Sequence, residues 1–133
     1  MFDKYSNSFL NDFNFDSILE KFERKTFRNY SAGDSVYDDN DYIHDIYFIL
    51  TGEVKLIKTE NYNNIQFTLR KLSGGDIIGV EDALTGSRFT SSAYTTQNSN
   101  ILVINKEDFI DLTKVNDEFN FWVLKYLSSG LFV

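Results

Sequence analysis

The 133-residue chain contains no cysteine and no proline, and it has only one histidine. Without cysteine it can form no disulfide, bind no iron–sulfur cluster through thiolates and use no thiol nucleophile. Metal enzymes need several histidines and carboxylates around one ion, and a Ser–His–Asp triad would require His44 as its base. His44 lies in an acidic stretch typical of a surface turn, with no nucleophile motif nearby. We therefore expect no enzyme activity, no metal site and no cofactor.

Long apolar runs and dense basic clusters are also missing. A transmembrane helix needs about 18 or more consecutive apolar residues, and no such run or signal-peptide pattern is present. The net charge is −7, whereas a DNA-binding surface needs clustered Lys and Arg residues. The densest basic segment, residues 21–28, reads as the solvated face of a helix. We expect a cytoplasmic protein that has no membrane partner and does not bind DNA by itself.

Glycines mark the turns between short β-type segments, at positions 52, 74, 75 and 79. Turn signals about every 8–12 residues are typical of a β-sandwich or roll. Residues 46–50 are predicted to form a central strand, and alternation over residues 65–70 predicts a half-buried strand. The residues that we expect to be mostly buried are Ile46, Phe48, Leu50, Val54, Leu56, Phe67 and Leu69.

Capping and turn residues place the other elements. Ser17 and Glu20 fit a capping box, which predicts a helix from Ser17 to about Lys25. Asn105 and Asn116 are expected to cap two further helices at their N-termini. The remaining predictions are a hairpin turn at 61–64, strands over 89–96 and 100–104, and a left-handed conformation at Asn40.

Three motifs in order, Tyr30–Gly33, Tyr47–Val54 and Leu72–Asp76 followed by Gly79, resemble the β-roll of the CRP/FNR and cyclic-nucleotide-binding superfamily. The resemblance covers about residues 27–127. It implies a mainly β fold, a double-stranded β-helix or jelly roll flanked by N- and C-terminal helices; another jelly roll with similar turns is the alternative. One domain is expected over residues 1–133, with a helical segment at 1–26, the β-roll at 27–104, and C-terminal helices at 105–133 that include the start of a dimerisation helix.

The resemblance also implies a function. In this family the β-roll is the effector-sensing domain of a transcription regulator, and DNA is bound by a C-terminal helix-turn-helix domain that these 133 residues do not contain. One alternative is a stand-alone module that binds a nucleotide or another small anion. A cupin-like metal enzyme is a third possibility, and the histidine count disfavours it.

The resemblance places an effector site in the segment from Gly79 to Ser92. Cyclic-nucleotide-binding relatives have a glutamate directly after the glycine for the ribose, and an arginine about ten residues later for the phosphate. Here those positions hold Val80 and Phe89, and the pattern resembles the FNR-type branch, which does not bind cyclic nucleotides. We expect weak or no cyclic AMP binding. Either an adjusted loop aims the neighbouring charges inward, or they are exposed loop residues. The candidate effector-binding residues are Gly79, Glu81, Arg88, Phe89, Thr90 and Ser91.

The C-terminal helix is apolar on almost every side. Phe119, Trp122, Val123, Tyr126 and Leu127 follow the i, i+3, i+4, i+7, i+8 spacing of a single helix face. Phe121 and Leu124 lie outside this stripe. The resemblance implies a homodimer in which the stripe packs against its copy. The alternative is that the stripe packs on the protein's own β-roll.

Overall fold

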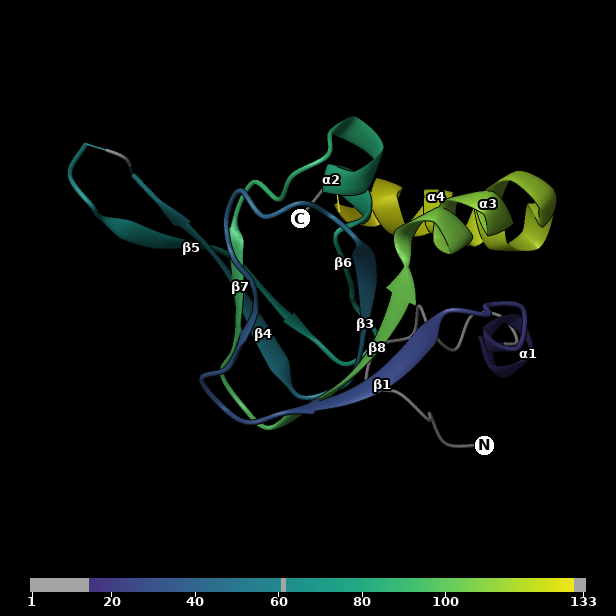
Figure 1. Ribbon diagram of the computed structural model, residues 1–133, viewed down its shortest axis with the longest axis horizontal. Helices are drawn as coiled ribbons and strands as arrows, with labels where there is room; N and C mark the ends of the chain where they lie inside the picture. The colour runs from purple at the N-terminus through teal and green to yellow at the C-terminus, as the bar shows by residue number, and fades with distance from the viewer. Residues whose placement is uncertain (1–14, 61, 131–133) are drawn as a thin grey trace.

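The computed structural model describes residues 15–60 and 62–130, and it confirms the mainly β fold with flanking helices. Two four-stranded antiparallel sheets, ordered β1-β8-β3-β6 and β2-β7-β4-β5, form the roll. Helices α3 and α4 lie beside the first sheet, while the β4–β5 hairpin extends away from the opposite side (Figure 1). The elements are α1 (Phe15–Leu19), β1 (Lys25–Tyr30), β2 (Ser35–Tyr37), β3 (Asp45–Thr51), β4 (Glu53–Thr59), β5 (Gln66–Ser73), β6 (Ile77–Ile78), α2 (Val80–Thr85), β7 (Ser92–Thr95), β8 (Ser99–Asn105), α3 (Lys106–Val115) and α4 (Asp117–Gly130).

The predicted central strand is β3, which pairs with β8 on one side and β6 on the other. Successive side chains of a strand point to opposite faces. Ile46 and Phe48 therefore join the apolar cluster under the helices, and Tyr47 and Ile49 join the cluster inside the roll. Because both faces are covered, residues 46–50 of the strand are all apolar instead of alternating with polar residues.

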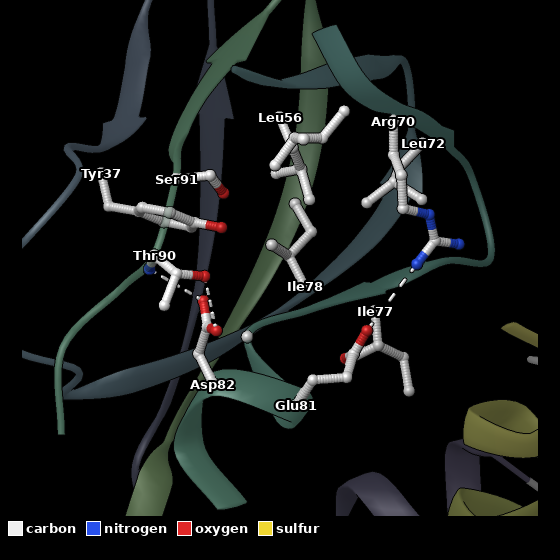
Figure 2. A pocket seen from close by; sticks show the side chains of 12 residues that line it. Tyr37, Leu56, Arg70, Leu72, Ile77, Ile78, Glu81, Asp82, Thr90 and Ser91 are labelled. Atoms are coloured by element: carbon white, nitrogen blue, oxygen red, sulfur yellow. Dashed lines mark hydrogen bonds and ion pairs between the residues drawn. The ribbon is translucent and has the colours of Figure 1, made fainter. Parts of the chain in front are cut away.

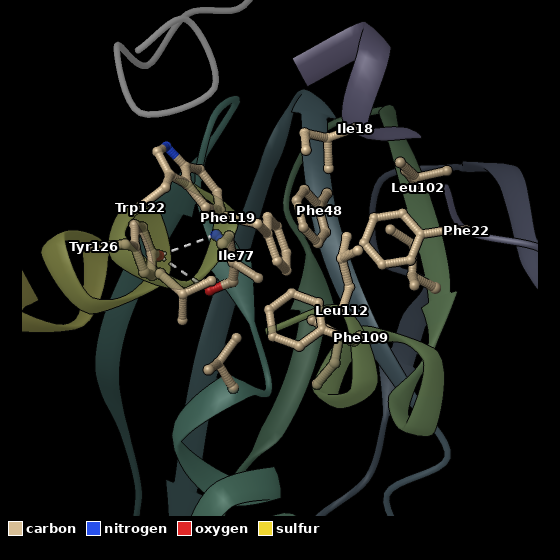
Figure 3. Close-up of a cluster of buried hydrophobic side chains, with 14 residues drawn as sticks. Ile18, Phe22, Phe48, Ile77, Leu102, Phe109, Leu112, Phe119, Trp122 and Tyr126 are labelled. Carbon is tan, nitrogen blue, oxygen red and sulfur yellow. Dashed lines mark hydrogen bonds between the residues drawn. The ribbon is translucent and has the colours of Figure 1, made fainter. Parts of the chain in front are cut away.

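Aromatic side chains fill the space between the first sheet and the helices (Figure 3). Phe48 lies 6.1 Å from Phe109 in an edge-on arrangement and 6.3 Å from Trp122 in a stacked one, between ring centroids. Phe119 contacts Phe22, Phe109 and Trp122 at 5.8, 5.2 and 5.9 Å. Offset and edge-on ring pairs at these distances stabilise a core beyond the area they bury. This cluster fixes α4 on the roll.

The capping residues in the sequence predicted the starts of the two C-terminal helices correctly, but not the extent of the N-terminal helix. The Asn105 and Asn116 side chains accept hydrogen bonds from the Asp108 and Phe119 amides at 3.1 and 2.8 Å, as predicted. The predicted helix from Ser17 to about Lys25 is wrong: α1 covers Phe15–Leu19. Lys25 already pairs with β8, and this long-range ladder overrides the local capping signal. The first fourteen residues of the predicted 1–26 segment lie outside the described residues.

The turn predictions hold at Asn40, whose φ is 73°, and at the connection between β4 and β5. Asn61 of that connection lies outside the described residues. The strand predicted over 89–96 begins later, as β7 at Ser92, and the following strand begins earlier, at Ser99.

Phe67 and Leu69 were predicted to be core residues, and this prediction is wrong. Their exposed fractions are 43% and 47%. β5 is the edge strand of the second sheet and pairs only with β4, so nothing among the described residues covers the outer part of the hairpin. Among the other predicted core residues, Leu50 and Leu56 are half-buried, whereas the rest, Ile46, Phe48 and Val54, are fully buried.

Tyr126 joins α4 to the edge strand β6 and gives a first prediction. Its hydroxyl accepts a hydrogen bond from the Ile77 amide and donates one to the Ile77 carbonyl, both at 3.0 Å and buried (Figure 3). Tyr126→Phe leaves a buried backbone donor and acceptor without this partner, so we expect a loss of about 1–3 kcal/mol in the free energy of unfolding. Urea denaturation followed by the fluorescence of Trp122 measures it.

Tyr94→Phe is the matched control, because its hydroxyl makes one exposed contact with Asp38 at 3.3 Å. We expect that variant to change the free energy of unfolding by less than about 0.5 kcal/mol. Equal losses for the two variants would show that the Tyr126 hydroxyl does not stabilise the attachment of α4.

Candidate functional site

A cavity of about 230 Å³ opens where β6 runs into α2, next to β4, β5 and the segment before β7. Five aliphatic side chains, Leu56, Leu69, Leu72, Ile77 and Ile78, line it together with polar groups. Figure 2 shows Leu56, Leu72, Ile77 and Ile78 in the middle and on the right of the view, and the polar groups of Tyr37, Ser91, Thr90 and Asp82 together on the left. The full lining is Tyr37, Leu56, Leu69, Arg70, Leu72, Ile77, Ile78, Gly79, Glu81, Asp82, Thr90 and Ser91.

Gly79 makes the tight turn from β6 into α2. Its φ is 101°, a region that side-chain-bearing residues rarely adopt. A Cβ at this position would lie 3.4 Å from the Phe89 ring, so the turn is also closely packed. The turn puts Val80 into the core and leaves Glu81 and Asp82, in the first turn of α2, at the cavity.

Two polar contacts shape the mouth of the cavity (Figure 2). The Asp82 carboxylate accepts hydrogen bonds from the Thr90 amide at 3.2 Å and from the Thr90 hydroxyl at 2.8 Å. These bonds hold the segment before β7 against α2. Across the opening, an Arg70 guanidinium nitrogen of β5 lies 3.7 Å from a Glu81 carboxylate oxygen.

Tyr37 forms one end of the cavity and is stacked on Phe89, with ring centroids 3.5 Å apart. Burial raises the pKa of the Tyr37 hydroxyl well above its ordinary value, the Asp82 charge raises it further, and the Ser91 hydroxyl acts in the opposite direction. Tyr37 therefore remains a neutral phenol that can donate a hydrogen bond at physiological pH.

The predicted effector residues separate into two groups. Gly79, Glu81, Thr90 and Ser91 line the cavity. Arg88 does not: its guanidinium donates to the Asn40 carbonyl at 2.8 Å and lies 3.8 Å over the Tyr42 ring. Phe89 is buried in the core cluster inside the roll, behind Tyr37. These two residues are thus held away from the cavity by contacts of their own.

Several lining residues were missed in the sequence. Asp82 directly follows Glu81, so its place in the first turn of α2 could have identified it. Tyr37 and Arg70 reach the cavity only because β2, β5 and α2 converge in the folded roll. No local pattern brings these residues together.

The C-terminal stripe predicted to form a dimer interface is instead buried within the protein. Phe119, Trp122, Val123 and Tyr126 belong to the core cluster under α4, and Leu127 packs against it. In one copy of the chain these side chains therefore pack on its own roll, and their contact with a partner stays a prediction. The exposed apolar residues of α4 are Phe121 and Leu124, at 63% and 51%.

His44 is exposed, as predicted for a surface turn. Within residues 15–60 and 62–130, no group of three or more His, Cys, Asp or Glu residues could hold a metal ion. No helix in this part of the chain is both long and apolar enough to cross a membrane.

Two sheets that form a roll, with a ligand-sized cavity where a short helix follows β6, define a β-roll binding domain. A family model described as the cyclic nucleotide-binding domain matches residues 27–116. The chain therefore belongs to the cyclic nucleotide-binding domain family. This family is one of binding domains.

Solved structures show the same fold. The catabolite activator protein of Thermus thermophilus matches with a TM-score of 0.77 and 18% identity over 94% of this chain and 58% of that one. The sensor domain of the transcriptional regulator DNR from Pseudomonas aeruginosa matches with a TM-score of 0.76 and 14% identity. That match covers 95% of this chain and 84% of the sensor domain. A transcriptional regulator from Thermotoga maritima matches with 0.74 and 23%, over 90% of both chains. The chain thus spans little more than half of the catabolite activator protein. No curated protein matches the chain in sequence.

Proposed function

We propose that the chain is the effector-sensing domain of a CRP/FNR-type transcription regulator, acting in the cytoplasm as one domain over residues 1–133. The cavity between the roll and α2 is the observation that carries this proposal, because it joins an apolar pocket to convergent polar groups. The likeness to regulator sensor domains supports it. DNA is contacted, in this proposal, only through a separate C-terminal helix-turn-helix domain. Titration of small molecules into the chain, with the backbone amides that line the cavity followed by NMR, is the direct test.

Cyclic AMP is not the effector in this proposal. Val80 occupies the position of the ribose-binding glutamate and is buried, and Phe89 occupies the arginine position and is stacked on Tyr37. Losing one charge-assisted contact to an anion costs about 2–5 kcal/mol, or roughly 30-fold to several-thousand-fold in affinity. We therefore expect titration calorimetry with cyclic AMP to show no saturation below about 1 mM.

Arg88→Ala is the informative variant for this prediction, since Arg88 is the basic residue next to the missing arginine. Because its guanidinium contacts Asn40 and Tyr42 outside the cavity, the substitution is expected to leave the calorimetric trace unchanged. Low-micromolar binding that Arg88→Ala abolishes would contradict the proposal and make Arg88 a phosphate ligand.

A homodimer formed through α4 is the second part of the proposal. Phe121 and Leu124 are three residues apart and share one helix face. This face is exposed, whereas the stripe is buried. In sedimentation equilibrium we expect the wild-type chain to dimerise and Phe121→Glu/Leu124→Glu to be monomeric with an unchanged denaturation midpoint.

Trp122→Glu is the matched control, because it places a charge in the core and should unfold the domain instead of only separating the protomers. A wild-type chain that stays monomeric at high concentration would refute the dimer.

A stand-alone small-molecule-binding module is the alternative function, and the same cavity supports it.

A further inference from the structure

The charges around the cavity determine which ligands it can accept. Its lining contains one basic residue, Arg70, and two acidic residues, Glu81 and Asp82. The cavity lining therefore carries a net negative charge at neutral pH, which repels an anionic ligand.

Arg70 is already paired at the mouth of the cavity. Its guanidinium lies 3.7 Å from the Glu81 carboxylate, and both side chains are partly exposed. Its charge also acts on Asp76, lowering the pKa of that carboxyl against the larger, opposite effect of burial. Two carboxylates thus act on this one cation, and a bound anion would compete with Glu81 for it.

The start of α2 offers no compensation for an anion. The backbone amides at a helix N-terminus attract negative charge, and Asp or Glu in the first turn satisfy that attraction. In this chain Glu81 and Asp82 occupy the first turn of a helix only six residues long. The protein's own carboxylates therefore already occupy the end of α2 that favours negative charge.

The same groups suit a cation. The Asp82 carboxylate accepts two hydrogen bonds, both from Thr90, and a carboxylate has about four acceptor positions. Asp82 is only partly buried, and in Figure 2 its carboxylate lies on the polar side of the cavity with the Tyr37 and Ser91 hydroxyls. An ammonium group near Asp82 would gain a charge-assisted contact.

Size and shape restrict the rest of the ligand. A dry cavity of about 150 Å³ is enough for benzene, and this cavity of about 230 Å³ has room for one ring and a short polar tail. Its aliphatic side, formed by the five Leu and Ile side chains, suits an apolar ring. A purine, a ribose and a cyclic phosphate together would not be enclosed.

We infer that the cavity binds a small amine with a one-ring apolar body, whose ammonium group pairs with Asp82, and that it discriminates against anions. This inference rests on the proposed function, because it names the ligand class of the same sensing site.

Three compounds of matched shape test the charge preference: benzylamine, benzyl alcohol and benzoate. Each is titrated into the full 133-residue chain, with the backbone amides followed by NMR. We expect benzylamine to shift the amides of Leu69, Thr90 and Ser91 and to bind about ten-fold or more tightly than benzoate, with benzyl alcohol between them. Asp82→Asn, which keeps an oxygen for the Thr90 amide, should abolish most of the difference between benzylamine and benzoate.

Asp111→Asn is the control for general attraction to an acidic protein, because Asp111 is an exposed residue of α3 and its loss changes the net charge equally. It should leave benzylamine binding unchanged. If benzoate binds as tightly as benzylamine, or if Asp82→Asn and Asp111→Asn have equal effects, the amine inference fails while the cavity remains a binding site. If none of the three compounds shifts the amides lining the cavity, the proposed sensing site fails and the inference fails with it.

Discussion

Phe48→Ala is expected to lower the free energy of unfolding by about 3–5 kcal/mol, the usual cost of truncating a buried aromatic side chain. Phe48 is fully buried in the middle of β3, the strand that pairs on both sides. Its ring contacts Phe109 of α3 and Trp122 of α4. The truncation therefore opens a cavity at the place where both C-terminal helices attach to the roll.

Phe67→Ala is the matched control, since it removes the same atoms from a side chain that is 43% exposed on the edge strand. It should cost less than about 1 kcal/mol, because the alanine leaves no enclosed void. Chemical denaturation of both variants, followed by circular dichroism, measures the two losses. A similar loss at both positions would contradict the placement of β3 in the core or of β5 at the edge.

The contrast between these two phenylalanines shows what hydrophobic alternation can predict. The pattern over Ile65, Phe67 and Leu69 identified a strand correctly, because the period of two follows from backbone geometry alone. It could not reveal that β5 lies at the edge of its sheet, in a hairpin that projects from the roll. What covers a strand is decided by long-range topology, which the alternation does not contain.

The same limit explains the C-terminal helix. The spacing of Phe119, Trp122 and Tyr126 predicted one continuous apolar face, and that face is present and buried. Periodicity shows that a face must be covered, yet it does not distinguish the protein's own roll from a second copy. The roll covers this face, and Phe121 and Leu124, which lie outside the stripe, stay exposed.

The candidate site was predictable where it is local in the sequence. Gly79 and Glu81 belong to one turn and one helix start, and both line the cavity. Arg88 is close to them in sequence, but the bridge between Tyr42 and Arg88 ties its backbone to the loop before β3. Arg70 is the converse case: it is distant from Gly79 and Glu81 in the pattern of the site, yet it lines the cavity because β5 pairs with β4.

Gly52→Ala is expected to lower the free energy of unfolding by about 2–5 kcal/mol, through two separate effects. Gly52 joins β3 to β4 with φ at 102°, so any side chain strains the backbone. A Cβ there would also lie 2.7 Å from the Ser99 Cα. Ser99 has little room to move, because it is buried, pairs with Tyr30 of β1, and its hydroxyl accepts from the Glu53 amide at 3.2 Å.

Gly33→Ala separates the two effects, since Gly33 has a similar φ of 90° and nothing within 4 Å of its added Cβ. It should show the backbone strain alone, about 1–3 kcal/mol. The excess loss in Gly52→Ala, measured by urea denaturation of both variants, then reports the clash with Ser99. If Gly52→Ala lowered the free energy of unfolding no more than Gly33→Ala does, Ser99 would move away from the added Cβ at no energetic cost. The close approach of the β3–β4 turn to β8 would then contribute nothing to the stability of the roll.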